Sequence, residues 1–296
     1  VCCLNNILIS LIEFLFLYKD IKIWFEGKGF HLDAEKRKDL VKINKKLSKL
    51  GSSFSKNISD HEDSILCSKE ELSGLPKNYI ANLKKDKKTN KFIVSLDYPE
   101  VGPFMSFADS DKKRKELAIK NGKKGGKRNL KILQEILLLR KEKSEILGFE
   151  SYSEMVVKHR MSKKPETIKK FLESTIDKLK PEVIKDTKKV KSFAKKELGI
   201  KDLTFYNSSY VGNKYRKHLF DYDPNITKEY FQMDKVMDYM FSLFGKLFDI
   251  SFKKNDLKLW DKDVLSFDVF RGGTKFSHII LDLYPRKGKY GHMACW

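Results

Sequence analysis

Histidines and cysteines are the residues of this chain that most readily bind metals or act in catalysis. The H-E-x-x-H zinc motif places two histidines one helical turn apart, so that both imidazoles face one metal ion. None of the six histidines has another four residues away; they are His31, His61, His159, His218, His278 and His292. In the nearest sequence, His61-Glu62-Asp63-Ser64-Ile65, an isoleucine that cannot bind zinc stands at the second position. We therefore predict no metal ligand within residues 1–296.

Nucleophilic catalysis has no recognisable set of residues here. The sequence contains no G-x-S-x-G elbow, and no cysteine stands beside a histidine in a recognisable setting. The pair Glu70-Glu71 is typical of the first turn of a helix, where acids complement the helix dipole. We interpret His278, within Phe-Ser-His-Ile-Ile, as a strand residue that is exposed or hydrogen-bonded. No catalytic residue is predicted in the chain.

An aromatic cluster and a basic loop are the remaining candidates for binding. The cluster fits a base-stacking surface or a peptide cleft, but packing between helices is the interpretation that we favour. Its members are Phe205, Tyr206, Tyr210, Tyr215, Phe220, Tyr222, Tyr230 and Phe231. The loop at residues 120–128 carries five cations and three glycines and suits an anion. Its glycines lack the spacing and the flanking strand and helix of a phosphate loop.

The net charge of +21 raises nucleic acid as a partner, because clustered cations release counterions from phosphate backbones. Lysine supplies nearly all of this charge, since only eight of the 61 basic residues are arginine. Lysine lacks the planar fork that grips phosphates and reads guanine edges. Most lysines also fall at the polar positions of helical patterns. We therefore favour a solvated surface and expect no nucleic-acid partner, while a basic nucleic-acid-binding helical protein remains the least favoured alternative.

The cysteines and the first residues indicate the compartment. Cys2, Cys3, Cys67 and Cys295 show neither C-x-x-C spacing nor the density of a disulfide scaffold, which favours a reducing, cytoplasmic setting. Residues 1–18 are strongly apolar, but the run from Ile7 to Tyr18 is interrupted by Glu13 and is too short to span a bilayer. We expect no membrane partner and interpret residues 1–18 as an apolar segment of unclear role, most simply a buried helix.

Helical patterns dominate the rest of the chain. Asp33 is expected to cap a helix with Leu40, Ile43, Leu47, Leu50 and Phe54 on its inner face. Residues 91–96 predict a strand, ended by Tyr98-Pro99 and Gly102-Pro103. A helix opens at Ser110, and a second starts at Asn129 with five residues inward and Gly148 at its end. Those five are Leu130, Leu133, Ile136, Leu137 and Leu147.

The C-terminal half changes from helices to strands. Ser151 to Glu154 fits a capping box, and Pro165 and Pro181 each stand where a proline opens a helix. The helix after Pro181 should close at Leu198-Gly199, and a helix at residues 234–247 should be heavily buried. Residues 264–270 and 276–284 flank Arg271-Gly-Gly-Thr274, which predicts a hairpin. The predicted fold class is mainly α, with a small β-hairpin or sheet near the C-terminus.

Blocks of sequence in a constant order resemble the thimet oligopeptidase and neurolysin family of zinc metallopeptidases. These blocks include Gly29–Leu32, Glu70–Pro76 against "EELxGLP", Leu138–Phe149, Lys228–Phe231, Trp260, and Leu281–Cys295 against "LDLYPREGKYGHAACF". One block departs from the family, since Phe205–Tyr210 blurs its Trp-Asp-x-x-Tyr-Tyr sequence. The resemblance identifies residues 19–296 as part of the oligopeptidase catalytic region, upstream of the H-E-x-x-H helix.

The resemblance implies a helical protein with a deep cleft, and a metalloendopeptidase that cleaves short peptides in the cytosol. Zinc is the cofactor of the full-length family member, with no ligands in this chain. Residues 1–296 are then expected to be inactive alone, and a non-catalytic peptide-binding remnant is the alternative. Because the strand before the metal helix can bind substrate through backbone groups, the candidate substrate-binding residues are Gly291, His292, Met293 and Ala294. The alternative is that Gly291 only permits a turn and His292 only packs.

Overall fold

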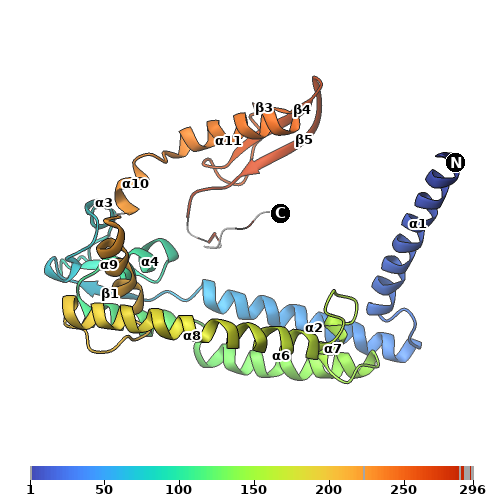
Figure 1. Ribbon diagram of the computed structural model, residues 1–296, viewed down its shortest axis with the longest axis horizontal. Helices are drawn as coiled ribbons and strands as arrows, with labels where there is room; N and C mark the ends of the chain where they lie inside the picture. The colour runs from blue at the N-terminus through green and yellow to red at the C-terminus, as the bar shows by residue number, and fades with distance from the viewer. Residues whose placement is uncertain (1, 223, 287, 290–293, 295–296) are drawn as a thin grey trace. The chain divides into compact units, whose positions relative to one another are not determined.

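The computed structural model describes residues 2–222, 224–286, 288–289 and 294, and in residues 2–13, 224 and 225 it describes the backbone alone. The described part is mostly helical with two small antiparallel sheets, which confirms the predicted fold class. The chain divides into two units (Figure 1). The first unit contains the residues up to Glu62 together with Ile119–Ser192, and the second contains Asp63–Ala118 and the residues from Phe193 onward.

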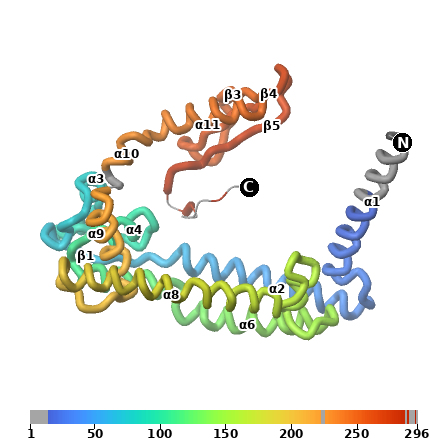
Figure 2. The backbone as a smooth tube through the Cα atoms, in the orientation of Figure 1, coloured from blue at the N-terminus to red at the C-terminus, as the bar shows by residue number. Residues whose placement is uncertain are grey.

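The first unit is built around two paired helices, α2 (Ala34–Ser59) and α6 (Gly126–Ile146). They run side by side in the backbone trace (Figure 2). The predicted cap of α2 is confirmed, because Asp33 Oδ1 accepts a hydrogen bond from the Lys36 amide at 2.9 Å. At its other end, buried Asn129 donates from Nδ2 to the Phe54 carbonyl at 3.0 Å and accepts from Asn57 Nδ2 at 2.9 Å.

The inner face of α6 differs from the prediction. Leu130, Leu133 and Leu137 are exposed, Ile136 is half-buried, and Leu139 and Leu147 are buried. The reason is the pair of hydrogen bonds made by Asn129, because a polar side chain bonded to α2 fixes which side of α6 faces that helix. Leu139 and Leu147 lie on that buried side, whereas Leu130 and Leu137 do not. Gly148, with φ of +80°, follows the end of α6 as predicted.

The prediction at Pro181 is also wrong. Pro165 opens α8 (Pro165–Leu198) as expected, but Pro181 lies inside this single helix of 34 residues. A proline within a helix removes one amide donor and frees one carbonyl. The surrounding residues are exposed, so water satisfies the freed carbonyl and the helix continues. The helix ends at Leu198, and Gly199 follows with φ of +67°.

Two further helices complete the first unit, α1 (Cys2–Gly27) and α7 (Tyr152–Val157). The predicted cap of α7 is confirmed, because Ser151 Oγ accepts from the Glu154 amide at 3.1 Å. The interpretation of the N-terminal segment as a buried helix is wrong for its described side chains, since Phe14 to Tyr18 are exposed. Among the described side chains of α1, ring packing is found at the C-terminal end, where Phe25 lies 4.9 Å from Phe30. Among the described residues, no helix is long and apolar enough to cross a membrane.

The second unit has a small core around a two-stranded sheet of β1 (Ser64–Cys67) and β2 (Phe92–Ser95). This core buries Ile65, Val94, Leu72, Phe104 and Leu117, among others. They come from the strands, the 3-10 turn η1 (Glu70–Leu72), α4 (Tyr98–Phe107) and α5 (Asp111–Gly122); α3 (Lys77–Ala81) flanks the core. The same burial raises the pKa of the Cys67 thiol to about 12.

Local sequence predicted this unit only in part. The strand at residues 91–96 is confirmed as β2, but its partner β1 was not anticipated. Pro99 and Pro103, expected to end the strand in a turn, lie within α4 instead. Pro99 stands in the first turn of α4, where the amide that proline lacks would have no partner within the helix. Pro103 lies inside α4, where it removes one hydrogen bond of the helix without ending it.

Asp109 joins this core to the later helix α9 (Ser208–Phe220). Its carboxylate accepts hydrogen bonds from Ser73 Oγ at 2.9 Å and Tyr210 Oη at 3.0 Å, and Lys214 Nζ lies 3.4 Å away. Burial, helped by Asp109, raises the pKa of Tyr210 to about 12. The buried guanidinium of Arg114 stacks on the Tyr210 ring at 4.0 Å and bonds Asp111 at 2.7 Å and the Ala108 carbonyl.

The C-terminal segment forms a three-stranded antiparallel sheet in the order β3-β4-β5. Its strands are β3 (Ser251–Lys254), β4 (Leu265–Arg271) and β5 (Thr274–Leu281), preceded by α10 (Pro224–Lys228) and α11 (Met233–Phe248). The predicted hairpin is confirmed, because Gly272 and Gly273 turn with φ of +54° and +80°. The strand β3 was not predicted.

Burial of α11 was overestimated from sequence. Phe241 packs its ring 4.7 Å from Phe252 and 4.6 Å from Phe267 on the sheet. Tyr239 and Leu247 are exposed, and none of the described side chains of α11 is fully buried. A helix that packs on one three-stranded sheet buries one stripe only, whatever its total apolar content.

Gly74 provides a test of how the second unit is packed. Its φ is +85°, and a Cβ at this position would collide with the Phe107 carbonyl oxygen. We expect Gly74→Ala to lower the free energy of unfolding by about 2 kcal/mol or more, from strain and this clash. The matched control is Gly102→Ala in α4, where the new methyl meets nothing within 4 Å; it should stabilise by about 0.5–1 kcal/mol. Urea unfolding measures both, and equal effects would contradict this packing.

Candidate functional site

The predicted substrate-binding residues lie at the end of the chain. Gly291, His292 and Met293 lie outside the described residues, and Ala294 is described as exposed with no regular secondary structure. The structure therefore describes the approach to this site rather than the site itself. That approach consists of β5 and the turn formed by residues 282–286 with 288–289, which we call the Asp282 turn.

Strand β5 offers a free backbone edge. It pairs with β4 through a register that runs from Leu265 opposite Leu281 to Arg271 opposite Thr274, with a bulge at Val269/Phe270. Among the described strands, none pairs with its other side. The first five residues of β5, from Thr274 to His278, are exposed. An exposed edge of this kind presents amide and carbonyl groups to which an extended peptide can add as another strand.

The Asp282 turn is closed by one carboxylate. Arg286 grips Asp282 with two parallel hydrogen bonds, from Nη1 at 2.6 Å and from Nη2 at 2.8 Å. Trp260, from the loop before β4, donates its indole N–H to Asp282 Oδ2 at 3.0 Å. Lys289 Nζ donates to the carbonyls of Asp282 at 2.7 Å and Tyr284 at 2.8 Å, and it lies 3.0 Å from Asp282 Oδ1. Because two N–H groups of Arg286 bind the two oxygens of Asp282, this contact fixes the orientation of the two side chains as well as their separation.

Electrostatics favour this closed turn. The hydrogen bonds from Arg286, followed by those from Trp260 and Lys289, hold the pKa of Asp282 well below its ordinary value near 3.8. The same contact raises the pKa of Arg286, which also lies 3.5 Å from Asp261 through Nε. Local sequence helps as well, because Pro285 cannot donate to a continuing sheet and Gly288 adopts a φ of +79°.

A second polar cluster lies across β4 and β5. Asp268 Oδ1 lies 2.8 Å from His278 Nδ1, directly opposite in the register, and 3.1 Å from Lys275 Nζ; it accepts from Asn255 Nδ2 at 2.6 Å. These partners hold the pKa of Asp268 below its ordinary value. The prediction that His278 is a strand residue, exposed or hydrogen-bonded, is confirmed, because it lies in β5 with an exposed side chain. Its pairing with a single carboxylate has the character of a cross-strand contact rather than a metal site.

The described residues do not fit a zinc site. Nowhere in this part of the chain do three histidine, cysteine, aspartate or glutamate side chains gather closely enough to hold a metal ion. At the near-match sequence, Ile65 lies in β1 and is 1% exposed within the core, so it is a packing residue. Structural zinc sites take four protein ligands and catalytic sites take three, and neither set is present among the described side chains.

Sequence reasoning missed the set of contacts that builds this turn. Trp260 and Asp282 belong to matching blocks, but no local pattern connects two residues that are 22 positions apart. The aromatic cluster was also interpreted too simply. Tyr210 is buried and Tyr215 packs 5.3 Å from Phe193, whereas four members of the cluster are more than 65% exposed. These four are Phe205, Phe220, Tyr230 and Phe231.

Comparison with known proteins places the chain among peptidases. Residues 104–296, more than half of the chain, match the profile of peptidase family M3. The chain is 31% identical over 286 residues to the thimet-like oligopeptidase of Dictyostelium discoideum, covering 92% of this chain and 42% of that protein. It is 28% identical over 283 residues to oligopeptidase A of Escherichia coli K12, covering 90% and 42%, and 29% identical over 299 residues to saccharolysin of Saccharomyces cerevisiae, covering 94% and 41%. The chain thus spans about two fifths of the length of these relatives.

Acid should open the Asp282 turn. Because the pKa of Asp282 is lower in the folded turn than in the unfolded chain, this group stabilises the turn above about pH 4, and the contribution is lost as the pH falls through the lowered value. With Trp24 and Trp296 replaced by phenylalanine, Trp260 becomes the sole tryptophan, and its fluorescence should change only below about pH 4. Asp282→Asn in the same background should remove that acid change. An identical change in both proteins would contradict the assignment.

Proposed function

The chain belongs to peptidase family M3, and from that premise we propose that it is part of a zinc-dependent endopeptidase that cleaves short peptides. The support is the family match over residues 104–296 together with alignments to proteins named as oligopeptidases. Residues 19–296 then form part of the catalytic region. The described side chains do not fit a zinc site, and the proposal assigns no metal ligand to residues 1–296.

In this proposal, the chain forms the wall of the cleft along which the peptide substrate binds. The free edge of β5 supplies backbone donors and acceptors, and the proposal adds the candidate substrate-binding residues 291–294 to this wall. Gly291, His292, Met293 and Ala294 would then pair with the backbone of the substrate. Backbone pairing accepts many sequences, because it reads main-chain groups and leaves specificity to side-chain pockets. A protease for varied short peptides requires such tolerance.

The Asp282 turn is the observation that supports this role most directly. Two hydrogen bonds from Arg286 and one from Trp260 fix the direction in which the backbone leaves β5. A wall that pairs with a peptide must hold its backbone groups in line with those of the peptide, because hydrogen bonds weaken steeply away from their preferred geometry. The carboxylate of Asp282 therefore acts as a positioning group, without touching the substrate.

We also propose the cytoplasm as the compartment and short peptides as the partners, with no nucleic acid. The spacing of the cysteines supports a reducing setting, and buried Cys67 is a free thiol.

Peptide hydrolysis tests the proposed activity. The natural gene product should cleave a quenched-fluorescent peptide of about ten residues, a metal chelator should abolish cleavage, and added zinc should restore it. Purified residues 1–296 should not cleave the peptide even with zinc. Cleavage that survives the chelator would contradict the proposal. Peptide binding with no cleavage by the natural gene product would favour a non-catalytic peptide-binding protein instead.

Kinetics of variants test the wall. In the natural gene product, Asp282→Asn removes a charge-assisted contact and should raise KM roughly tenfold, with a smaller effect on kcat. Gly291→Val, which adds bulk on the proposed backbone path, should also raise KM. The control is Lys253→Gln on β3, an exposed residue of the same sheet, which should leave both constants unchanged. If Asp282→Asn behaves like the control, the turn does not position the peptide.

A further inference from the structure

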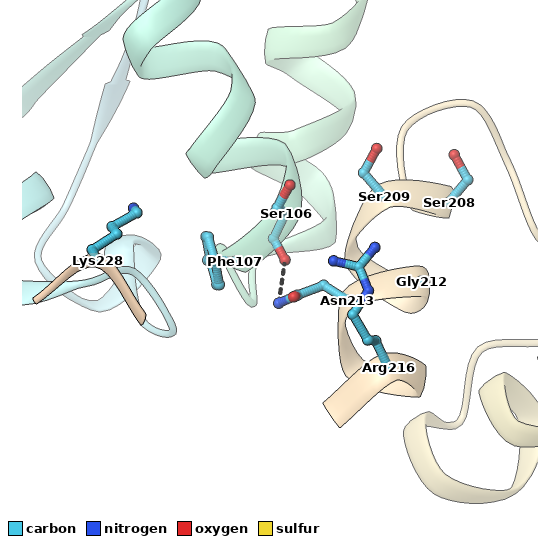
Figure 3. Close-up of a pocket in the computed structure, with 8 residues that line it drawn as sticks. All are labelled: Ser106, Phe107, Ser208, Ser209, Gly212, Asn213, Arg216 and Lys228. Atoms are coloured by element: carbon cyan, nitrogen blue, oxygen red, sulfur yellow. Dashed lines mark hydrogen bonds between the residues drawn. The ribbon is translucent and has the colours of Figure 1, made fainter. Parts of the chain in front are cut away.

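A pocket of about 520 Å³ lies in the second unit, lined by none of the residues of β5 or the Asp282 turn. Figure 3 shows its walls. The end of α4 contributes Ser106 and Phe107, one face of α9 contributes Ser209, Gly212 and Arg216, and α10 contributes Lys228. Pockets that bind small organic ligands usually enclose about 300–1,000 Å³. This pocket therefore has room for more than a bare ion.

The lining is positively charged. Two of the lining residues, Arg216 and Lys228, are cations, and among the residues that the structure describes no aspartate or glutamate lines the pocket. Arg216 forms no hydrogen bond or ion pair with any other described residue, so its guanidinium is available to a ligand. It extends along α9 toward Ser209, whereas Lys228 stands on the other side of Phe107 (Figure 3). An arginine fork and serine hydroxyls are the donors that phosphate and carboxylate oxygens accept best.

The helix α9 adds to this preference. It begins at Ser208 with no side-chain cap, so the positive end of its dipole stays available beside the pocket. Asn213 does not compete for the ligand, because its Nδ2 donates to the Ser106 carbonyl at 3.2 Å and ties α4 to α9. The two walls are therefore held together without using Arg216.

Gly212 supports a binding role for this pocket independently of the charges. It lies within α9, where glycine costs about 1 kcal/mol relative to alanine. Its φ is not in the left-handed region, and a Cβ at this position would meet nothing within 4 Å. Neither backbone geometry nor close packing in the chain therefore requires a glycine. The missing side chain leaves the α9 side of the pocket open instead.

We propose that this pocket binds an anionic small molecule whose phosphate or carboxylate group is held by Arg216 and the hydroxyl of Ser209. The ring of Phe107 contacts the organic part of the ligand, and Lys228 adds charge from the opposite wall. The inference does not depend on the proposed peptidase activity, since it rests on residues of α4, α9 and α10 alone.

Binding to the full chain tests this site with defined probes. Adenosine monophosphate and an acetylated dipeptide acid are titrated by calorimetry, each against its uncharged counterpart, adenosine or the dipeptide amide. We expect at least one anionic probe to bind, and its counterpart to bind at least tenfold more weakly. Phosphate-only binding identifies a phosphate ligand, and carboxylate-only binding identifies a carboxylate ligand. If neither anion binds better than its counterpart, the proposal is wrong.

Variants separate the pocket from general surface charge. Arg216→Gln should weaken binding by about tenfold or more, since it removes a charge-assisted contact. Lys217→Gln, one residue along α9 and outside the pocket lining, removes the same charge and should change binding less than twofold. Gly212→Leu should block binding, because the new side chain would fill the pocket from the α9 side. Equal effects of the two charge variants would show attraction to a basic surface only.

A measurement on the unmodified chain covers the case in which a variant fails to fold. Arginine modification by phenylglyoxal, mapped by mass spectrometry, should slow several-fold at Arg216 when the bound probe is present. Arg160, which does not line the pocket, serves as the internal reference and should react at an unchanged rate. Equal rates at Arg216 with and without the probe would overturn the proposal.

Discussion

The carboxylate of Asp109 is the contact on which the second unit depends. This unit is assembled from two stretches of sequence, residues 63–118 and the residues after 193, which are separated by more than seventy positions. Asp109 meets Ser73 in the first stretch and Tyr210 and Lys214 in the second. The stacked guanidinium of Arg114 fixes the Tyr210 ring from the other side. Two segments that are distant in sequence therefore meet at one acid, and α9 is held against α4.

Both candidate sites rely on fixed polar contacts of this kind. The anion pocket exists because α9 lies against the end of α4, which Asp109 and the bond from Asn213 to the Ser106 carbonyl both secure. The Asp282 turn repeats the arrangement on a smaller scale, with one carboxylate receiving an arginine fork, an indole and a lysine. In each case, a single acid with several donors limits the backbone to one arrangement, which is the property that a binding wall needs.

Helix caps and turns could be predicted from the sequence, whereas contacts between distant elements could not. Asp33, Pro165 and the Gly272-Gly273 pair act on their immediate neighbours, and the structure has them where the sequence predicts. The inner face of α6 and the continuation of α8 through Pro181 depend on which element lies opposite and on what is exposed, so periodicity alone predicted them wrongly.

The candidate site shows the same division. The block Leu281 to Cys295 indicated which residues to examine, but its decisive contact joins Trp260 to Asp282, which no local pattern connects. The pocket beside α9 carries no recognisable motif. It arises from a glycine and an arginine four residues apart on one helix face, together with the end of a helix that is distant in sequence.

Hydrogen–deuterium exchange on the natural gene product tests most directly whether the edge of β5 binds peptide. With its metal removed to prevent cleavage, the protein is compared with and without a saturating short peptide. The account predicts slower amide exchange in residues 274–281 and 290–294, with little change in β3. Protection that is absent from β5 and the residues after it, with the peptide demonstrably bound, would contradict the account.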